Sequence, residues 1–171
     1  SEFYRNPNQW EVLEKDILPF LISKSKSLKV WSAACSTGDE PYTLVMVLNK
    51  FFPLSSIRIL ATDIDKNALE KAKAGIYTYK SLEKLPRPFI EKYFLKAGNF
   101  FKIKDEVKAC VDFKHHNLLR DEYPTNFDLI VCRNVLIYFT EDAKNDIYQK
   151  LNRALKTKGV LFVGSTEQII M

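Results

Sequence analysis

The residues best suited to chemistry lie in the run 31–42, which reads WSAACSTGDEPY. We predict a strand over Lys29–Ser32, a turn of small residues around Gly38, and a helix that opens at Pro41, because the fixed φ of proline suits the first helical position. A pyrophosphate cradle requires G-x-G-x-x-G, since only glycine lets the backbone approach the phosphates. With one glycine, and with the carboxylate of Glu40 at its mouth, this turn instead favours a cationic ligand that carries hydroxyl groups.

A second acidic position supports a nucleoside ligand. Asp63 follows the predicted strand 57–61, where an acidic residue accepts hydrogen bonds from a ribose diol in nucleoside-binding folds. The alternative role, capping the next helix, suits Asp65 better. A nucleoside with a positive centre and no phosphate cradle points to S-adenosylmethionine (SAM) rather than to NAD or ATP.

The elements that must position these residues alternate between strands and helices. Such alternation predicts an α/β, Rossmann-like fold with a mostly parallel sheet, in which ligands bind beyond the carboxyl ends of the strands. The predicted strands are 29–32, 57–61, 110–113, 127–131 and 160–163. The polar residues that follow these strands therefore form one rim, made of 36–40, Asp63, Asn117-Leu118, 132–134, Ser165 and Glu167.

The predicted helices carry recognisable ends. Asn6 caps a helix with Pro7 in its first position and Trp10, Leu13, Ile17 and Phe20 on its buried face. Asp65 caps the helix 67–74 and Gly75 ends it. Thr140 caps a last helix, whose stripe is Ile147, Leu151 and Leu155 and whose end is marked by Lys156, Lys158 and Gly159.

Residues 76–108 interrupt this alternation and are rich in aromatic side chains. We predict a helix over 88–94 followed by a small antiparallel hairpin that includes 101–107, inserted into the main fold. Residues 75–108 hold eight Lys and Arg against four Asp and Glu, so most of the formal net charge of +5 lies there. Two interpretations remain open: a solvated face, or a docking surface for an acidic macromolecule.

Composition bounds the remaining classes. A chain of 171 residues with 46% hydrophobic and 27% charged residues suits one globular domain. No apolar run is long enough to span a membrane and no signal-peptide pattern opens the chain. Three cysteines without C-x-x-C spacing predict a reduced, cytoplasmic protein. No metal site is expected, because the adjacent His115 and His116 diverge and no ligand cluster accompanies them.

Five motifs carry a resemblance to a known family. They are residues 31–42, ATDID at 61–65, NLL at 117–119, CRNVLIYF at 132–139 and GSTE at 164–167. In this order they resemble the CheR chemotaxis receptor methyltransferases. The resemblance implies a class I methyltransferase fold with SAM as cofactor and S-adenosylhomocysteine as product. It also implies methyl transfer to glutamate side chains on the cytoplasmic domains of membrane chemoreceptors, and a β-subdomain inserted between the second and third core strands.

The resemblance also implies the domain layout. Residues 1–75 and 109–171 correspond to the SAM-binding methyltransferase domain, and residues 76–108 correspond to the inserted β-subdomain. The family's N-terminal helical docking domain is expected to be absent from this chain, which starts at the family's T-x-F-F-R motif.

Site residues follow from the same motifs. Phe3-Tyr4-Arg5 resembles T-x-F-F-R, with Ser1 in the position of the threonine. Ser1 and Arg5 would therefore bind the cofactor, Arg5 as a planar fork for the carboxylate of its methionine part. The other implied cofactor-binding residues are Glu40, Asp63, Asn117, Leu118, Arg133 and Asn134. Arg133 and Tyr138 would lie near the transferred methyl group and orient the acceptor carboxylate.

Alternatives remain at this stage. One is a CheR-like enzyme of another signalling pathway, and another is a non-catalytic SAM-binding module, against which Arg133 and Tyr138 count. A nucleic-acid methyltransferase is disfavoured because the fourth strand lacks an N/D-P-P-Y motif. We expect a monomer that neither binds nucleic acid nor inserts into a membrane.

Overall fold

The computed structural model describes residues 2–133 and 138–164, and residues 1, 134–137 and 165–171 lie outside this description. A five-stranded sheet with the order β6-β2-β1-β7-β8 forms the centre, and every neighbouring pair in it is parallel. Its strands are β1 (Val30–Ala33), β2 (Ile59–Asp63), β6 (Val111–His115), β7 (Phe127–Cys132) and β8 (Leu155–Val163). The mostly parallel α/β sheet predicted from the sequence is therefore confirmed.

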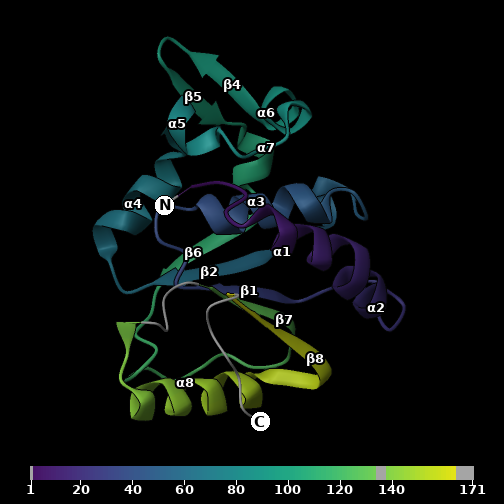
Figure 1. Cartoon of the computed structure of the whole chain (residues 1–171), viewed down its shortest axis with the longest axis vertical. Coiled ribbons are helices and arrows are strands. Elements are labelled where there is room, and N and C mark those ends of the chain that lie inside the picture. The colour runs from purple at the N-terminus through teal and green to yellow at the C-terminus, as the bar shows by residue number, and fades with distance from the viewer. Residues whose placement is uncertain (1, 134–137, 165–171) are drawn as a thin grey trace.

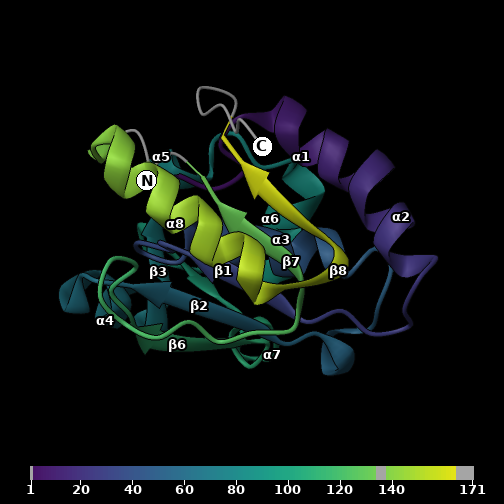
Figure 2. The same ribbon diagram turned by 90° about the horizontal axis from the view of Figure 1, so that it is seen from below.

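Helices cover both faces of this sheet, as Figures 1 and 2 show. One face carries α1 (Pro7–Val12), η1 (Leu13–Ile17), α2 (Leu18–Ile22), α3 (Asp39–Leu48) and α4 (Lys66–Ala74), and the other carries α8 (Glu141–Ala154). All residues of β1 and β7 are buried, as expected for central strands covered on both faces. A short 3₁₀ helix, η2 (Leu54–Ser56), precedes β2.

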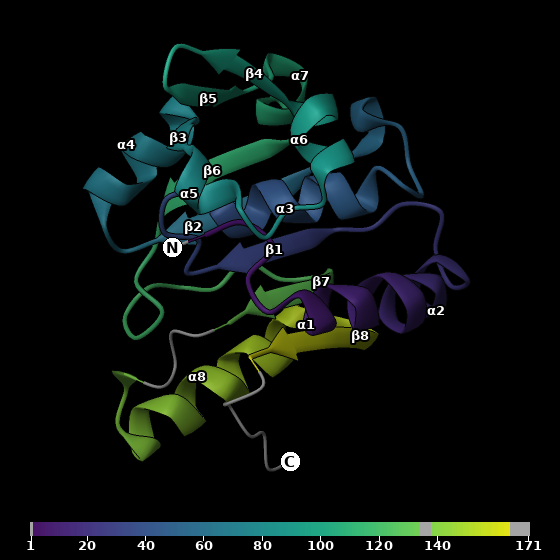
Figure 3. The same ribbon diagram turned by 45° about the horizontal axis from the view of Figure 1, so that its top comes forward.

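Above the helical layer lies a second, antiparallel sheet with the order β3-β5-β4 (Figures 1 and 3). This segment comprises β3 (Ile76–Thr78), α5 (Tyr79–Leu82), α6 (Arg87–Tyr93), β4 (Phe94–Ala97), β5 (Phe100–Ile103) and α7 (Asp105–Lys108). A small inserted antiparallel sheet was predicted and is present. The hairpin lies earlier in the chain than predicted. Strands β4 and β5 are joined by a turn at Gly98, which has φ 61°, and residues 105–108 form a helix rather than a strand.

The N-terminal helix departs from the predicted face. Asn6 adopts a left-handed conformation with φ 59° and its side chain makes no capping hydrogen bond. Trp10 and Leu13 are buried as expected, but residues 13–17 form a π-helix, in which each turn holds an additional residue. The face therefore continues through Leu18 and Leu21, and the predicted Phe20 is 44% exposed.

The other helix ends are partly as predicted. Asp65 caps α4, because its Oδ1 accepts hydrogen bonds from the backbone N–H groups of residues 67 and 68, and Gly75 ends that helix with φ 67°. Thr140 caps α8 through its Oγ1. Helix α3 begins at Asp39, so Pro41 is its third residue, where the missing N–H still costs no helical hydrogen bond.

The end of α8 differs most from expectation. The helix stops at Ala154 and β8 starts at the next residue, so Lys156, Lys158 and Gly159 lie within the strand rather than closing the helix. Residue 155 pairs with Phe127, the first residue of β7, and the register shifts between residues 127 and 129. Residues 155–159, which the helical pattern assigns to the end of α8, therefore belong to β8, because residue 155 already pairs with β7.

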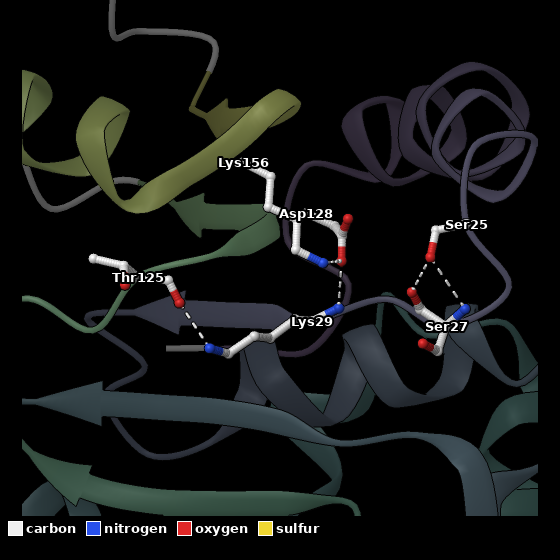
Figure 4. Close-up of polar contacts among 6 residues, drawn as sticks. All are labelled: Ser25, Ser27, Lys29, Thr125, Asp128 and Lys156. Atoms are coloured by element: carbon white, nitrogen blue, oxygen red, sulfur yellow. Dashed lines mark hydrogen bonds and ion pairs between the residues drawn. The ribbon is translucent and has the colours of Figure 1, made fainter.

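A polar network fixes the edge at which the strands begin, and Figure 4 shows it. The Oδ2 atom of Asp128 accepts a hydrogen bond from the backbone N–H of Lys29 at 2.8 Å. The same atom forms an ion pair with the Nζ atom of Lys156 at 3.3 Å. Lys29 Nζ donates to the carbonyl of Thr125 at 2.7 Å. These contacts join the starts of β1, β7 and β8, and the opposite edge carries the candidate site.

Candidate active site

A cavity of about 330 Å³ opens at the carboxyl edge of the parallel sheet. It gathers side chains from the N-terminal segment, from the turn after β1 and from the ends of β2 and β7. Its lining residues are Glu2, Arg5, Trp10, Ala34, Cys35, Ser36, Asp39, Glu40, Asp63, Arg133 and Tyr138. This is the edge at which ligands bind in open α/β sheets.

The turn after β1 has an unusual backbone. Ala34, Ser36 and Gly38 have φ values of 65°, 50° and 94°, all in the left-handed region. Left-handed conformations are costly for residues with a side chain and persist where surrounding contacts impose them. Here the N–H of Cys35 donates to the carbonyl of Thr62 at 2.8 Å, which fastens the turn to β2. The strain is thus located in the wall of the cavity.

Two carboxylates from the first turn of α3 enter the cavity wall. Glu40 Oε1 accepts a hydrogen bond from the Ser32 hydroxyl at 2.9 Å. Asp39 is 2% exposed, and its Oδ1 accepts a hydrogen bond from the Thr37 hydroxyl at 2.5 Å. The positive end of the helix dipole stabilises both charges. Asp39 belongs to the predicted polar rim 36–40 but was not among the predicted cofactor-binding residues, although its place beside Glu40 at a helix start was the available signal.

Asp63 ends β2, and the turn holds it by both of its oxygens. Oδ2 accepts a hydrogen bond from the N–H of Ser36 at 2.8 Å, and Oδ1 accepts one from the N–H of Asp65 at 2.9 Å. A carboxylate has about four acceptor sites, so each oxygen keeps capacity for a further donor. The carboxylate is therefore oriented in advance on the cavity wall.

Arg133 follows β7 and is 5% exposed. Its Nε donates to the side-chain oxygen of Gln9 at 3.1 Å and its Nη2 donates to the backbone carbonyl of Arg5. The guanidinium lies 4.8 Å from the ring centroid of Trp10, whose indole N–H donates to the same Arg5 carbonyl. Arg133 thus fastens the segment that carries Arg5 onto the end of β7, a contact that sequence reasoning missed.

The structure brings together only some of the predicted site residues. Arg5, Glu40, Asp63, Arg133 and Tyr138 all line the cavity, and the ring of Tyr138 is exposed. Ser1 and Asn134 lie outside the described residues.

Asn117 and Leu118 are not among the described residues that line the cavity. The side-chain oxygen of Asn117 accepts a hydrogen bond from the N–H of Leu119 at 2.9 Å, so it stabilises its own turn. Leu118 is 9% exposed and packs in the apolar cluster around Trp31. Asn117 thus stabilises its own turn and Leu118 packs in the core, and their predicted role toward the cofactor stays a prediction.

The charges of the cavity suit the predicted cofactor. Its lining holds the carboxylates of Glu2, Asp39, Glu40 and Asp63 and the guanidinium groups of Arg5 and Arg133. SAM carries a sulfonium, an ammonium and a carboxylate, so it offers two positive charges to the acidic wall and one negative charge to an arginine. The residues present therefore fit SAM.

Burial makes the cysteine in this wall unreactive. Desolvation raises the pKa of the Cys35 thiol, and the carboxylates of Asp63 and Glu40 raise it further. Desolvation likewise raises the pKa of Cys110, and all three cysteines are buried free thiols. Because the thiolate is the reactive form, a raised pKa lowers its fraction at pH 8.

We expect Ellman's reagent at pH 8 to titrate essentially no thiol in the folded protein and all three in urea. The measurement is the absorbance released before and after unfolding. A thiol that reacts at the rate of free cysteine in the folded protein would contradict the burial of these side chains.

Within 2–133 and 138–164, no group of three His, Cys, Asp or Glu side chains is arranged to hold a metal ion. In the described part of the chain, no helix is both long and apolar enough to cross a bilayer.

Comparison with known proteins agrees with this geometry. A family model described as CheR methyltransferase, SAM binding domain, matches residues 1–171. The chemotaxis protein methyltransferase of Listeria innocua is 43% identical over 171 residues, which are 99% of this chain and 65% of that protein. The one from Borreliella burgdorferi is 36% identical over 179 residues, covering 98% of this chain and 63% of that protein. The chain therefore spans slightly less than two thirds of each relative.

Among solved structures, the DszA carbon methyltransferase aligns with a TM-score of 0.60 at 16% identity, covering 92% of this chain and 35% of the other. At this identity the likeness concerns the fold, and it confirms the predicted Rossmann-like class I methyltransferase architecture. The family match over the full sequence shows that the chain belongs to the CheR methyltransferases and comprises the SAM-binding domain of that family.

Proposed function

We propose that this domain is the catalytic part of a protein-glutamate O-methyltransferase that methylates glutamate side chains on the cytoplasmic domains of chemoreceptors in bacterial chemotaxis. The observation that carries the proposal is one cavity in which an acidic turn and Asp63 meet Arg5 and Arg133. The names of the relatives, chemotaxis protein methyltransferases, support the pathway.

In this proposal the acidic wall and the N-terminal segment bind SAM. Asp63 accepts hydrogen bonds from the ribose hydroxyls, because both of its oxygens are already oriented by backbone N–H groups. Glu40 contributes negative charge near the positive groups, and Arg5 binds the carboxylate through its planar guanidinium. When bound, SAM supplies an electrophilic methyl group on a positively charged sulfur.

The acceptor requires little activation. A glutamate side chain is ionised at neutral pH, so no general base is needed to make it a nucleophile. The chain's contribution is to hold the acceptor close and aligned and to exclude water. Tyr138 lines the cavity with an exposed ring, and we assign its hydroxyl the role of orienting the acceptor carboxylate.

For Arg133 we propose a second role beside the one that the resemblance implies. Its Nε and Nη2 donate to Gln9 and to the Arg5 carbonyl, and its plane lies on Trp10. We therefore assign it two tasks, to keep the Arg5 segment over the cavity and to add positive charge where the acceptor carboxylate arrives. A guanidinium already engaged by neutral oxygens attracts the acceptor without forming a tight ion pair that would blunt the nucleophile.

The setting that fits this activity is the cytoplasm, and we propose that the domain acts there as a monomer on a receptor partner. The excess of Lys and Arg in residues 75–108 suits an acidic protein surface.

The test is methyl transfer from tritiated SAM to cytoplasmic fragments of chemoreceptors. We expect label in the receptor that mild base releases as methanol, since a carboxyl methyl ester is base-labile. Base-stable label would instead indicate methylation of another group. A domain that binds S-adenosylhomocysteine (AdoHcy) but transfers no methyl group would be a non-catalytic binding module.

Tyr138→Phe tests whether the hydroxyl orients the acceptor carboxylate without contributing to cofactor binding. Loss of one hydrogen bond to the acceptor is expected to lower turnover by about tenfold, with the affinity for AdoHcy unchanged. Equal turnover in the variant would remove this role from Tyr138.

A further inference from the structure

Tyr77 joins the antiparallel sheet to the cavity wall. It lies in β3 and is 7% exposed. Its hydroxyl donates a hydrogen bond to the backbone carbonyl of Thr37 at 2.6 Å, across 40 residues of sequence. Thr37 stands between Ser36 and Gly38, two of the left-handed residues of the turn.

The contact is close as well as polar. A Cβ atom on Gly38 would lie 2.9 Å from the Tyr77 hydroxyl oxygen and 3.0 Å from both Ala72 Cβ and Tyr42 Cε2. The absence of a side chain at Gly38 is what allows the tyrosine to reach the turn. The hydroxyl therefore occupies a position that the turn leaves for it.

The ring of Tyr77 is itself fixed from the opposite direction. Phe3, which is fully buried, packs edge-to-face against it with ring centroids 4.7 Å apart, and Phe3 packs in the same manner on Phe94 of β4 at 5.3 Å. The backbone N–H of Phe3 donates to the carbonyl of Ser81 in α5. The N-terminal segment, the antiparallel sheet and the turn thus meet at this one tyrosine.

The hydroxyl group remains a donor throughout the working pH range. Desolvation raises the pKa of Tyr77, and the negative charge of Asp39 raises it further. A neutral phenol can donate to a carbonyl, whereas a phenolate cannot.

We infer that Tyr77 is a positioning residue through which the antiparallel sheet holds the turn 34–38 in the conformation that binds SAM. The inference rests on the proposed binding of SAM in this cavity. A turn with three left-handed residues needs outside contacts to stay populated, and the hydrogen bond to Thr37 is one that comes from the inserted segment. Because coupling between sites is reciprocal, occupancy of the cavity also stabilises the packing of the antiparallel sheet.

The experiment compares Tyr77→Phe with Tyr93→Phe by calorimetric titration with AdoHcy. Tyr93 is the matched control, since it is a buried tyrosine of the same segment whose hydroxyl donates chiefly to Asn49 Oδ1 at 2.8 Å, with the Met46 carbonyl at 3.5 Å, at the other end of α3. Both substitutions remove one hydroxyl and its hydrogen bond. We expect Tyr77→Phe to weaken AdoHcy binding by about tenfold and Tyr93→Phe to leave it within twofold of the wild type.

Two further measurements distinguish positioning from general stability. With receptor fragments, Tyr77→Phe should raise the KM for SAM and keep kcat within twofold. By amide hydrogen exchange, AdoHcy should increase protection of residues 76–78 and 100–103 in the wild type and in Tyr93→Phe, but not in Tyr77→Phe.

The outcomes separate the two proposals. If the wild type fails to bind AdoHcy, the proposed function fails. If the wild type binds AdoHcy and both variants bind it equally well, the role of Tyr77 is overturned. The role is also overturned if the loss of affinity in each variant simply follows the decrease in its melting temperature.

Discussion

Gly38→Ala is expected to abolish detectable AdoHcy binding and to lower the free energy of unfolding by about 2–4 kcal/mol. Gly38 has φ 94°, which a residue with a side chain adopts only at a cost. The new methyl group would also meet Tyr77, Ala72 and Tyr42 at 3.0 Å or less, so one of these neighbours or the turn must move. Because the turn forms part of the cavity wall, its movement displaces the lining residues beside it, Ser36 before Gly38 and Asp39 and Glu40 after it.

Gly98→Ala is the matched control. Gly98 also has a left-handed φ, of 61°, but a Cβ atom there would meet nothing within 4 Å. This variant carries the backbone cost alone, of about 1–2 kcal/mol, and should bind AdoHcy as the wild type does. Thermal unfolding gives the stabilities and calorimetry gives the affinities. Equal affinity in both variants would show that the turn tolerates displacement.

Asp63→Ala is expected to weaken AdoHcy binding by at least about 100-fold, because two hydrogen bonds from ribose hydroxyls to a charged acceptor are lost. The substitution also removes the acceptors of the N–H groups of Ser36 and Asp65, so the turn loses its orientation. Both effects act on the nucleoside end of the ligand. Titration of each variant with AdoHcy and with adenosine measures the loss.

Asp65→Ala controls for damage to the same loop. Its carboxylate caps α4 and is not among the described residues that line the cavity. Loss of a helix cap costs about 1 kcal/mol of stability. We expect unchanged AdoHcy affinity in this variant. An Asp63→Ala protein that binds as tightly as Asp65→Ala would place the ribose elsewhere.

Local patterns predicted the parts of the fold that depend on local chemistry. The largely apolar runs around Trp31 and Leu129 marked the central strands, because strands covered on both faces are predominantly apolar. The caps formed by Asp65 and Thr140 were readable because a helix start needs an acceptor for its unpaired N–H groups. The rim followed from these, since parallel strands bring their carboxyl ends to one edge.

The remainder depended on contacts between distant residues. Nothing near Arg133 indicates that its guanidinium donates to the carbonyl of Arg5, 128 positions earlier. Burial of Asp39 is set by the packing of α3 in the fold, and the early start of β8 is set by pairing of residue 155 with Phe127. Spacing along the chain cannot encode such contacts, and family resemblance supplied the roles without their geometry.

The π-helix over Leu13–Ile17 has a consequence for how this segment tolerates changes of length. A turn that already accommodates one surplus residue can lose one and become an ordinary α-helical turn. Such a deletion would leave Trp10 against Arg133 and keep Leu18 and Leu21 on the buried face, because the five-residue step from Leu13 to Leu18 would become the four-residue step of an α-helical face. Natural variants one residue shorter between Leu13 and Leu18 are therefore expected to keep apolar side chains where Leu18 and Leu21 now stand.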